Sequence, residues 1–459
     1  MSDWFDAEAH ADRALEMFER GRLAEAESEL RKALALNPDH PEWQFNLGLT
    51  LEASGRDIDA LDSYRRAAEL MPTEAEPRVA AGAVCNRLQR FSDAIEYLEA
   101  ANSIEPRHEA AYAHRIESHF RMGDHDGAET TFYLSQQALD EPSPPCLAIM
   151  AESLIERREF DRAGWCLREA IRLDPTMPRI RARLAAVCAA TNMPQRALQL
   201  YLRDLRDDPG NIETLLDYGE LLIGLGRHVE AGEKFRRVLE LEPANIDAHH
   251  RLGQIAMAAG RHEAAHMEFE LVYKLDSDYP QIRMAIAETL IRRERTAEAQ
   301  TFLRHQLDLY HGEEQDSRAT FDLVRFGRLL LQSGMPRDAA QILEDGLRRD
   351  GESPELLRQL ALARFDSGDR DGGVIASRRV IRLDPACIPS MHNLAMAALD
   401  EGRLRTASGW ISRGLRIDRH DEGLRRLRVR LWLAAVVYVG RRFTRKVKAG
   451  SQRAQNTPA

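Results

Sequence analysis

Residues 41–74 read PEWQFNLGLTLEASGRDIDALDSYRRAAELMPTE, and this stretch predicts the architecture of most of the chain. Apolar residues recur every three or four positions on both sides of Gly55, which predicts two amphipathic helices joined by a tight turn. Pro72 is expected to end the second helix, because proline lacks the amide hydrogen that a further turn needs. The stretch therefore predicts a helical hairpin.

This hairpin is one of a series with a period of 34 residues. The period is plainest in two trios of prolines: Pro38, Pro72 and Pro106, then Pro175, Pro209 and Pro243. Twelve units fit from residue 7 onward with two insertions, Ser143 and residues 314–319. Such a period is typical of a solenoid, in which each hairpin buries its apolar face against its neighbours. We number the positions of a unit as slots 1 to 34.

Small residues recur at two slots of the unit. Slot 20 holds alanine in eleven units and Gly373 in the other, and slot 8 holds mostly glycine or alanine. We expect slot 8 of the first helix to face slot 20 of the second, with the bulky slot 24 packed against the next unit. Ala231→Leu should then overpack the hairpin and destabilise it by about 1 to 3 kcal/mol. Glycines near slot 15 suit the turn.

These positions resemble the tetratricopeptide repeat family. The residues that carry the resemblance in the second unit are Trp43, Leu47, Gly48, Gly55, Ala60, Tyr64, Ala67 and Pro72, with Trp43 one slot before its usual place. The resemblance implies an all-α, right-handed superhelical solenoid of about twelve 34-residue helix-turn-helix repeats with a C-terminal capping helix. Ile116 at slot 8 and Ser377 at slot 24 depart from the pattern.

The pattern divides the chain into segments. They are a lead-in at 1–6, units one to four at 7–142, units five to nine at 144–313, the insertion at 314–319, units ten to twelve at 320–421, a basic amphipathic capping or interfacial helix at 422–448, and a disordered tail at 449–459.

Charge and cysteine content indicate the cellular compartment and a segment suited to attachment. Residues 424–459 carry ten Lys or Arg and no Asp or Glu, so residues 1–423 carry a net charge of −20. Such asymmetry is typical of an attachment segment. Five scattered cysteines without a Cys-x-x-Cys pair argue against a disulfide framework. The acidic N-terminus has no basic and apolar leader, so we expect a cytoplasmic protein, with a peripheral position at a membrane as the alternative.

The resemblance implies that slots 2, 5, 9, 12 and 13 line a concave groove. In units four to nine the candidate residues at slots 9 and 12 are Glu117, Phe120, Glu152, Ile155, Glu220, Ile223, Gln254, Met257, Glu288 and Ile291. Carboxylates beside apolar side chains favour a basic or amide-rich peptide partner. The alternative is an ordinary solvated face of charged residues.

One segment matches a catalytic motif. His262, Glu263 and His266 follow the His-Glu-x-x-His pattern of zinc hydrolases. The previous unit has Gly226-Arg227-His228 at the slots of Gly260-Arg-His262, so the first histidine belongs to the repeat turn. Glu288 could be proposed as a third zinc ligand, but we interpret its spacing from His266 as accidental. We therefore expect no metal, no cofactor and no catalytic residue.

The basic segment after unit twelve allows three interpretations. Leu424, Leu427, Leu431 and Ala435 share a helical face that can cap the array. Candidate contacts with an anionic surface are Arg425, Arg426, Arg430, Trp432, Tyr438, Arg441, Arg442, Arg445 and Lys446. The other two interpretations are a cap followed by a basic tail, and contact with an acidic partner. Contact with nucleic acid is not expected.

Together these features predict a non-catalytic scaffold that binds partner peptides or helices in its groove. The alternatives are a membrane-surface adaptor or regulatory array that recruits a separate catalytic subunit, and a zinc hydrolase. Repeat sequence reports packing and leaves the partner open.

Overall fold

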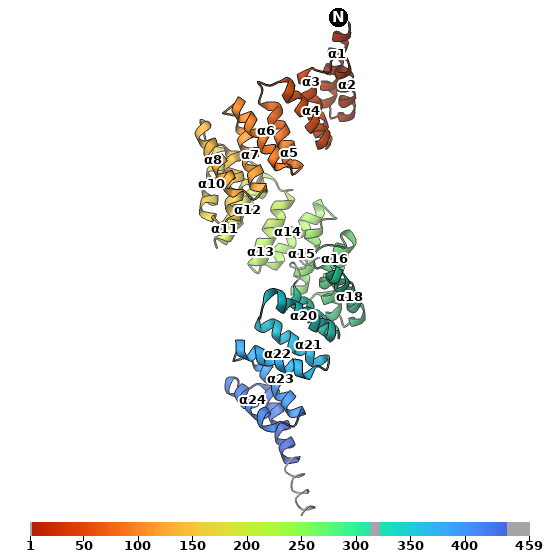
Figure 1. The fold of residues 1–459 in the computed structure, drawn as a ribbon, viewed down its shortest axis with the longest axis vertical. Coiled ribbons are helices and arrows are strands. Elements are labelled where there is room, and N and C mark those ends of the chain that lie inside the picture. The colour runs from red at the N-terminus through yellow and green to blue at the C-terminus, as the bar shows by residue number, and fades with distance from the viewer. Residues whose placement is uncertain (1, 313–321, 438–459) are drawn as a thin grey trace, which may run out of the picture. The chain divides into compact units, whose positions relative to one another are not determined.

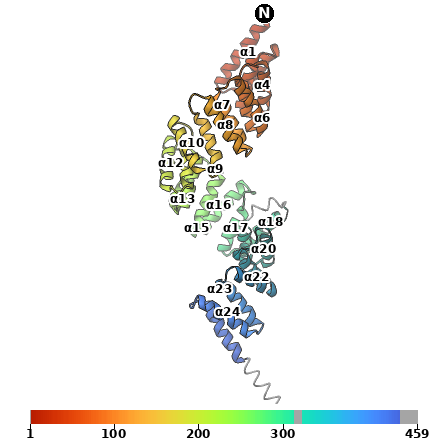
Figure 2. The same cartoon turned by 60° about the vertical axis from the view of Figure 1, so that its left-hand side comes forward.

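The computed structural model describes residues 2–312 and 322–437, and the side chains of residues 6–312 and 322–437. The insertion predicted at 314–319 and the tail predicted at 449–459 lie outside these ranges. Within them every regular element is an α-helix, and the chain divides into an N-terminal body, Met1–Leu241, and a C-terminal body, Glu242–Ala459. In each body consecutive helices lie side by side as hairpins (Figures 1 and 2). The prediction of an all-helical array of about twelve hairpins is confirmed.

The N-terminal body contains α1 Ser2–Glu19, α2 Leu23–Leu36, α3 Pro41–Ala53, α4 Asp57–Leu70, α5 Glu76–Arg87, α6 Phe91–Ile104, α7 Glu109–Arg121, α8 His125–Ala138, α9 Pro144–Glu156, α10 Phe160–Leu173, α11 Ile180–Ala190, α12 Pro194–Asp207, α13 Ile212–Gly224 and α14 His228–Leu241. The C-terminal body contains α15 Ile246–Ala258, α16 His262–Leu275, α17 Ile282–Arg292, α18 Thr296–Gly312, α19 Leu323–Gln332, α20 Pro336–Asp350, α21 Pro354–Asp366, α22 Arg370–Leu383, α23 Ile388–Asp400 and α24 Leu404–Ile417. A further helix covers 422–437.

Several first helices begin at a polar side chain that caps them. The Oδ1 atom of Asn211 accepts a hydrogen bond from the Thr214 backbone N–H at 2.9 Å. The inserted Ser143 does the same for α9, since its Oγ accepts from the Cys146 N–H at 3.2 Å. A capping side chain satisfies one of the amide groups that the first turn leaves unpaired. The one-residue insertion therefore supplies the cap of the helix that follows it.

The turn inside each hairpin has a left-handed residue at slot 15. The backbone angle φ is positive at this slot in all twelve units, with values such as +72° at Gly55 and Gly226. Eight of these residues are glycine; the others are Gln89, Arg158, Asn192 and Glu294. Glycine has no Cβ to clash in this region, whereas most other residues lose stability there. The turn geometry is thus common to all units even where glycine is missing.

The nearest neighbour of slot 8 is the slot 24 side chain of the same unit, and the expectation that slot 8 faces slot 20 stays a prediction. A Cβ atom built on Gly219 would lie 2.5 Å from Cζ of Phe235, and one built on Gly253 would lie 2.7 Å from Cδ1 of Phe269. Both rings belong to slot 24 of the same unit and are buried. The bulky slot 24 side chain crosses to the first helix of its own hairpin, so the missing Cβ at slot 8 makes room for it.

Unit eleven, the exception at slot 20, has its own packing. A Cβ on Gly373 would lie 2.8 Å from the ring of Phe365, which is at slot 12 of the same unit. The Phe365 ring therefore occupies space that the alanine methyl group takes elsewhere. Ser377 at slot 24 is buried, and its Oγ has no hydrogen-bond partner among the described residues.

Two first helices, α11 and α17, start behind a left-handed residue. In units six and nine a proline at slot 1 precedes a left-handed residue at slot 2, Arg179 with φ +55° and Gln281 with φ +61°. The helices α11 and α17 then begin at slot 3, with Ile180 and Ile282 buried. The left-handed conformation lets Arg179 Nη2 reach Oδ2 of Asp217 on α13 at 2.8 Å.

Candidate peptide-binding surfaces

In the N-terminal body, two slot 9 carboxylates already have cationic or histidine neighbours. Oε1 of Glu152 lies 3.1 Å from Nη1 of Arg183 on the next first helix. Oε2 of Glu117 lies 3.6 Å from Nδ1 of His114, and the hydrogen bond from His114 lowers the pKa of Glu117. Glu220 is exposed. A basic peptide would have to compete with Arg183 for Glu152.

In the C-terminal body, Glu288 is held between arginines of the next unit. Its Oε2 lies 2.8 Å from Nη2 of Arg325, and its Oε1 lies 3.8 Å from Nη2 of Arg328. Gln254, the slot 9 residue of the preceding unit, accepts a hydrogen bond from Arg251 at 2.9 Å. Arginine thus accompanies both candidate slot 9 residues of this body, Gln254 and Glu288, so the local surface is less acidic than these two residues alone suggest.

The slot 12 side chains are available for apolar contact. All five are partly exposed: Phe120, Ile155, Ile223, Met257 and Ile291. The guanidinium of Arg121 lies 5.8 Å from the centre of the Phe120 ring, a distance typical of a cation–π contact. The predicted binding residues are therefore partly accessible, and their role in binding remains a prediction.

A partly buried histidine also lies near this surface in the C-terminal body. The ring of His250, at slot 5, lies 5.0 Å from that of Tyr279 and 5.8 Å from that of Phe269. Oη of Tyr279 donates a hydrogen bond to Oδ1 of Asp247 at 3.0 Å. Burial lowers the pKa of His250 to about 4, with a smaller contribution from Arg251. The sequence showed no sign of this cluster, because its burial depends on the neighbouring helices.

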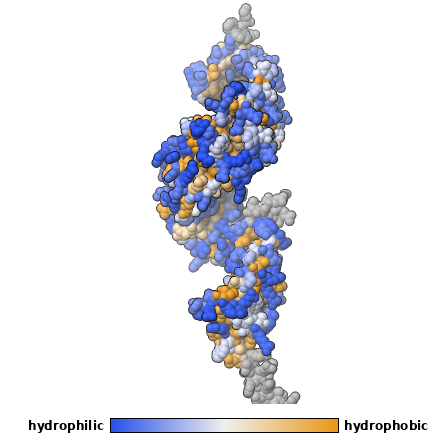
Figure 3. Space-filling view, turned by 90° about the vertical axis from the view of Figure 1, so that its left-hand side faces the viewer, coloured by the Kyte–Doolittle hydropathy of each residue, from blue (hydrophilic) through white to orange (hydrophobic). Residues whose placement is uncertain are grey.

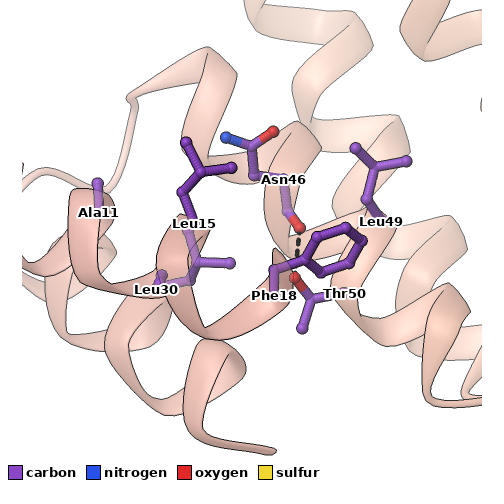
Figure 4. A pocket seen from close by; sticks show the side chains of 8 residues that line it. Ala11, Leu15, Phe18, Leu30, Asn46, Leu49 and Thr50 are labelled. Atoms are coloured by element: carbon purple, nitrogen blue, oxygen red, sulfur yellow. Dashed lines mark hydrogen bonds between the residues drawn. The ribbon is translucent and has the colours of Figure 1, made fainter. Parts of the chain in front are cut away.

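The N-terminal body has an apolar pocket that sequence reasoning missed. It lies between α1, α2 and α3, and Figure 4 shows the side chains of Leu15, Phe18 and Leu49 around it. The full lining is Ala11, Ala14, Leu15, Phe18, Leu30, Asn46, Leu49 and Thr50. Its cavity volume of about 70 Å³ is well below that of small-ligand sites, about 300 to 1,000 Å³, so the pocket is too small for a typical small ligand.

The pocket occupies the groove slots of the first two units. Leu15 and Leu49 are at slot 9, where four later units carry glutamate, and Phe18 is at slot 12. Leu15 is 55% exposed and Leu49 is 36% exposed. The hydroxyl of Thr50 donates to the Asn46 backbone carbonyl at 2.8 Å, so it is not left unpaired at the pocket wall (Figure 4). Leucine at slot 9 in both units was the signal that could have revealed this pocket.

Two residues of the zinc-hydrolase motif, His266 and Glu263, have partners within the repeat array, whereas Nδ1 of His262 is buried without a hydrogen-bond partner among the described residues. Nδ1 of His266 lies 3.1 Å from Oγ1 of Thr289, and its Nε2 lies 3.3 Å from Oε1 of Glu270. Burial lowers the pKa of His266. Glu263 pairs with Arg293 at 2.8 Å. In the described part of the chain, no three His, Cys, Asp or Glu side chains are grouped so that they could hold a metal ion.

The helix at 422–437 packs one face on the last hairpin. Leu424 and Leu427 are buried, and Nη2 of Arg430 lies 2.9 Å from Oδ1 of Asp400 on α23. Trp432 is 66% exposed. Apolar surface is visible at this end of the C-terminal body in Figure 3. No helix in the described ranges is long and apolar enough to cross a membrane. The predicted contacts Tyr438, Arg441, Arg442, Arg445 and Lys446 lie outside those ranges.

Comparison with protein families gives matches along much of the chain. One model described as a tetratricopeptide repeat matches residues 11–75 and 324–386, and a second model with the same description matches 222–270 and 256–317. A curated relative, the cytochrome c-type biogenesis protein CycH of Rhizobium meliloti (strain 1021), is 46% identical over 52 residues, 11% of this chain. The matched segment spans 14% of that relative's length.

Solved structures with a similar fold share little sequence with this chain. Cut9–Hcn1 of the APC/C gives a TM-score of 0.41 at 13% identity, over 91% of this chain and 95% of the other. Yeast Tom70 gives 0.38 at 15% identity, over 98% and 99%. Pseudomonas aeruginosa pilF gives 0.40 at 19% identity, over 49% of this chain and all of the other. Similarity at this level carries no inference about partners.

Proposed function

Because the chain belongs to the tetratricopeptide repeat proteins, we propose that it is a non-catalytic scaffold that binds a segment of a partner protein on the groove slots of its first helices. The segment is basic and carries a large apolar side chain that enters the pocket bounded by Leu15, Phe18 and Leu49. The remaining groove residues, from Glu117 to Ile291, extend the contact along each body.

The N-terminal pocket is the observation that carries this proposal. Two leucines at slot 9 are more than a third exposed, although burying them would stabilise the folded chain. Exposed apolar side chains gathered around a cavity are typical of interaction sites. They would accept a leucine-sized or phenylalanine-sized anchor.

The charge around the pocket supports a basic partner. Residues 2–53, which hold α1 to α3, carry twelve Asp or Glu and five Lys or Arg. Asp12 and Glu19 are exposed on α1, close in sequence to Leu15 and Phe18. Opposite charge on the partner would speed association and favour the correct partner over an acidic one.

A peptide library displayed on phage and selected on the full chain tests the proposal. We expect the selected peptides to be rich in Lys or Arg and to share a Leu, Ile, Met or Phe. Leu15→Asp with Leu49→Asp should abolish their binding, because a carboxylate would then lie in the apolar pocket. Ile58→Asp is the control, since Ile58 is 70% exposed on α4 outside the pocket.

The same selection tests the acidic groove residues. Glu152→Lys with Glu220→Lys should weaken the binding of basic peptides that reach beyond the pocket. Selected peptides that bind the pocket variant and the parent chain equally would overturn the pocket proposal. Circular dichroism of each variant shows whether the helices remain folded.

Attachment to a membrane surface is a second candidate. It rests on the exposed apolar side chains of the helix at 422–437, and its argument follows.

A further inference from the structure

The helix at 422–437 continues the repeat in phase. If residue 422 is counted as slot 1, Leu424 falls at slot 3, which is buried in many of the preceding units, as Trp43, Ile180 and Ile282 show. Leu424 is fully buried and contacts the backbone of α24 at Gly414. The helix therefore has the position of the first helix of a thirteenth hairpin.

Within the described ranges, the opposite face of this helix is left uncovered. In each of the twelve hairpins the slot 8 residue is buried, and where it is glycine its nearest neighbour is on the second helix of the same hairpin. Here slot 8 is Val429, which is 60% exposed. Four more apolar side chains on the same face are over half exposed: Trp432, Leu433, Val436 and Val437. Their spacing of three and four residues places them in one continuous stripe about 12 Å long.

Cations surround the open stripe. Arg425, Arg426, Arg428 and Arg430 precede it or flank it, and all four are exposed. Glu422, which pairs with Arg426 at 3.1 Å, is the only acidic residue of the helix. A second copy of the chain would bring a second set of arginines to the same face. Like charges at that distance repel, which disfavours a symmetric pair of these helices.

We propose that the open stripe of the 422–437 helix binds the surface of an anionic lipid bilayer. The apolar side chains would enter the boundary between headgroups and acyl chains, with Trp432 at the depth that indole rings prefer. The arginines project at several angles around the helix. A charged surface attracts all of them within about 10 Å, whereas a single acidic helix would pair with those on one side.

This inference goes beyond the groove and does not depend on it. The buried face of the helix keeps its contacts with the last hairpin, so binding needs no unfolding of the array. The apolar stripe contributes burial in the bilayer, and the basic cluster contributes electrostatic attraction to anionic lipids. Attachment of a peripheral protein usually needs both contributions.

Sedimentation of the full chain with lipid vesicles tests the proposal. The probes are phosphatidylcholine vesicles with and without phosphatidylserine. We expect binding only when phosphatidylserine is present, and weaker binding at high salt. Trp432→Asp with Val436→Asp should reduce binding at least about tenfold. Two apolar side chains that would enter the bilayer then become negative charges that the acidic surface repels.

Two further variants make the result interpretable. Val229→Asp adds the same charge at a side chain that is 76% exposed on α14, and it should leave vesicle binding unchanged. Trp432→Ala removes the ring without adding charge and should weaken binding in the same direction. Selected groove peptides should bind the Trp432→Asp, Val436→Asp variant normally, which separates this proposal from the groove proposal.

Several outcomes would overturn the proposal. They are no binding of the full chain to phosphatidylserine vesicles, equal binding to vesicles without it, or equal binding by the double variant. A dimer in analytical ultracentrifugation that the double variant dissociates would assign the stripe to a second copy instead.

Discussion

The contact between slot 8 and slot 24 gives a sharp prediction at Gly219. A methyl group on Gly219 would lie 2.5 Å from Cζ and 2.7 Å from Cε1 of Phe235. Phe235 is fully buried, so its ring cannot move aside without disturbing other contacts. Gly219→Ala should therefore destabilise the α13–α14 hairpin by about 1 to 3 kcal/mol.

A control in the same helix isolates the packing effect. Gly224 ends α13, and a Cβ built on it meets no atom within 4 Å. Gly224→Ala should be neutral or stabilising by up to about 1 kcal/mol, because alanine loses less backbone freedom than glycine on folding.

A double-mutant cycle identifies the partner. Units five and nine combine alanine at slot 8 with leucine at slot 24, namely Ala151 with Leu167 and Ala287 with Leu303. Phe235→Leu should therefore relieve the clash of Gly219→Ala, and the double variant should lose at least about 1 kcal/mol less than the sum of the single losses.

Hydrogen exchange of the α13 and α14 amides is the suitable assay, since repeat arrays need not unfold in one step. Additive effects of Gly219→Ala and Phe235→Leu would refute the assigned contact. Coupling of Gly219→Ala to Ala231→Gly instead would restore the partner expected from the sequence.

Three other predictions follow from the fold. Arg158→Gly should stabilise its hairpin by about 1 kcal/mol in thermal denaturation, because φ is +61° there and glycine tolerates that region; equal stability of parent and variant would contradict it. Ser143→Ala should cost about 1 kcal/mol through loss of the cap on α9, seen as faster amide exchange at Cys146, and unchanged exchange would exclude a capping role. The pKa of His250 is lowered from 6.5 to about 4, so the unfolded chain takes up a proton first as the pH falls. Stability of the C-terminal body should decrease from about pH 6.5 toward pH 4, and His250→Gln should reduce this decrease in urea titrations.

Much of the fold could be predicted from one period. The spacing of Pro38, Pro72 and Pro106 and the alanines at slot 20 indicated helical hairpins in series, because each hairpin repeats the same packing and the same turn. The left-handed turn was readable where glycine stands at slot 15. It was not readable at Gln89, Arg158 or Glu294, whose side chains give no local sign of a positive φ.

The candidate site was less accessible to sequence reasoning. Partners such as Arg183 for Glu152 and Arg325 for Glu288 lie 31 and 37 residues away, and only the stacking of successive first helices brings them together. The glutamates at slot 9 also favoured a binding groove in units four to nine. The pocket at Leu15 and Leu49 depends on how α1, α2 and α3 close around a space, which periodicity does not describe.

The cap supplied by Ser143 bears on how such a chain can change its length. The extra residue lies between α8 and α9, and the 34-residue phase resumes directly after it with the new helix properly started. A junction that absorbs an added residue in this way is a natural breakpoint for recombination. Whole hairpins could be duplicated or lost there as cassettes, leaving the register inside every remaining hairpin intact.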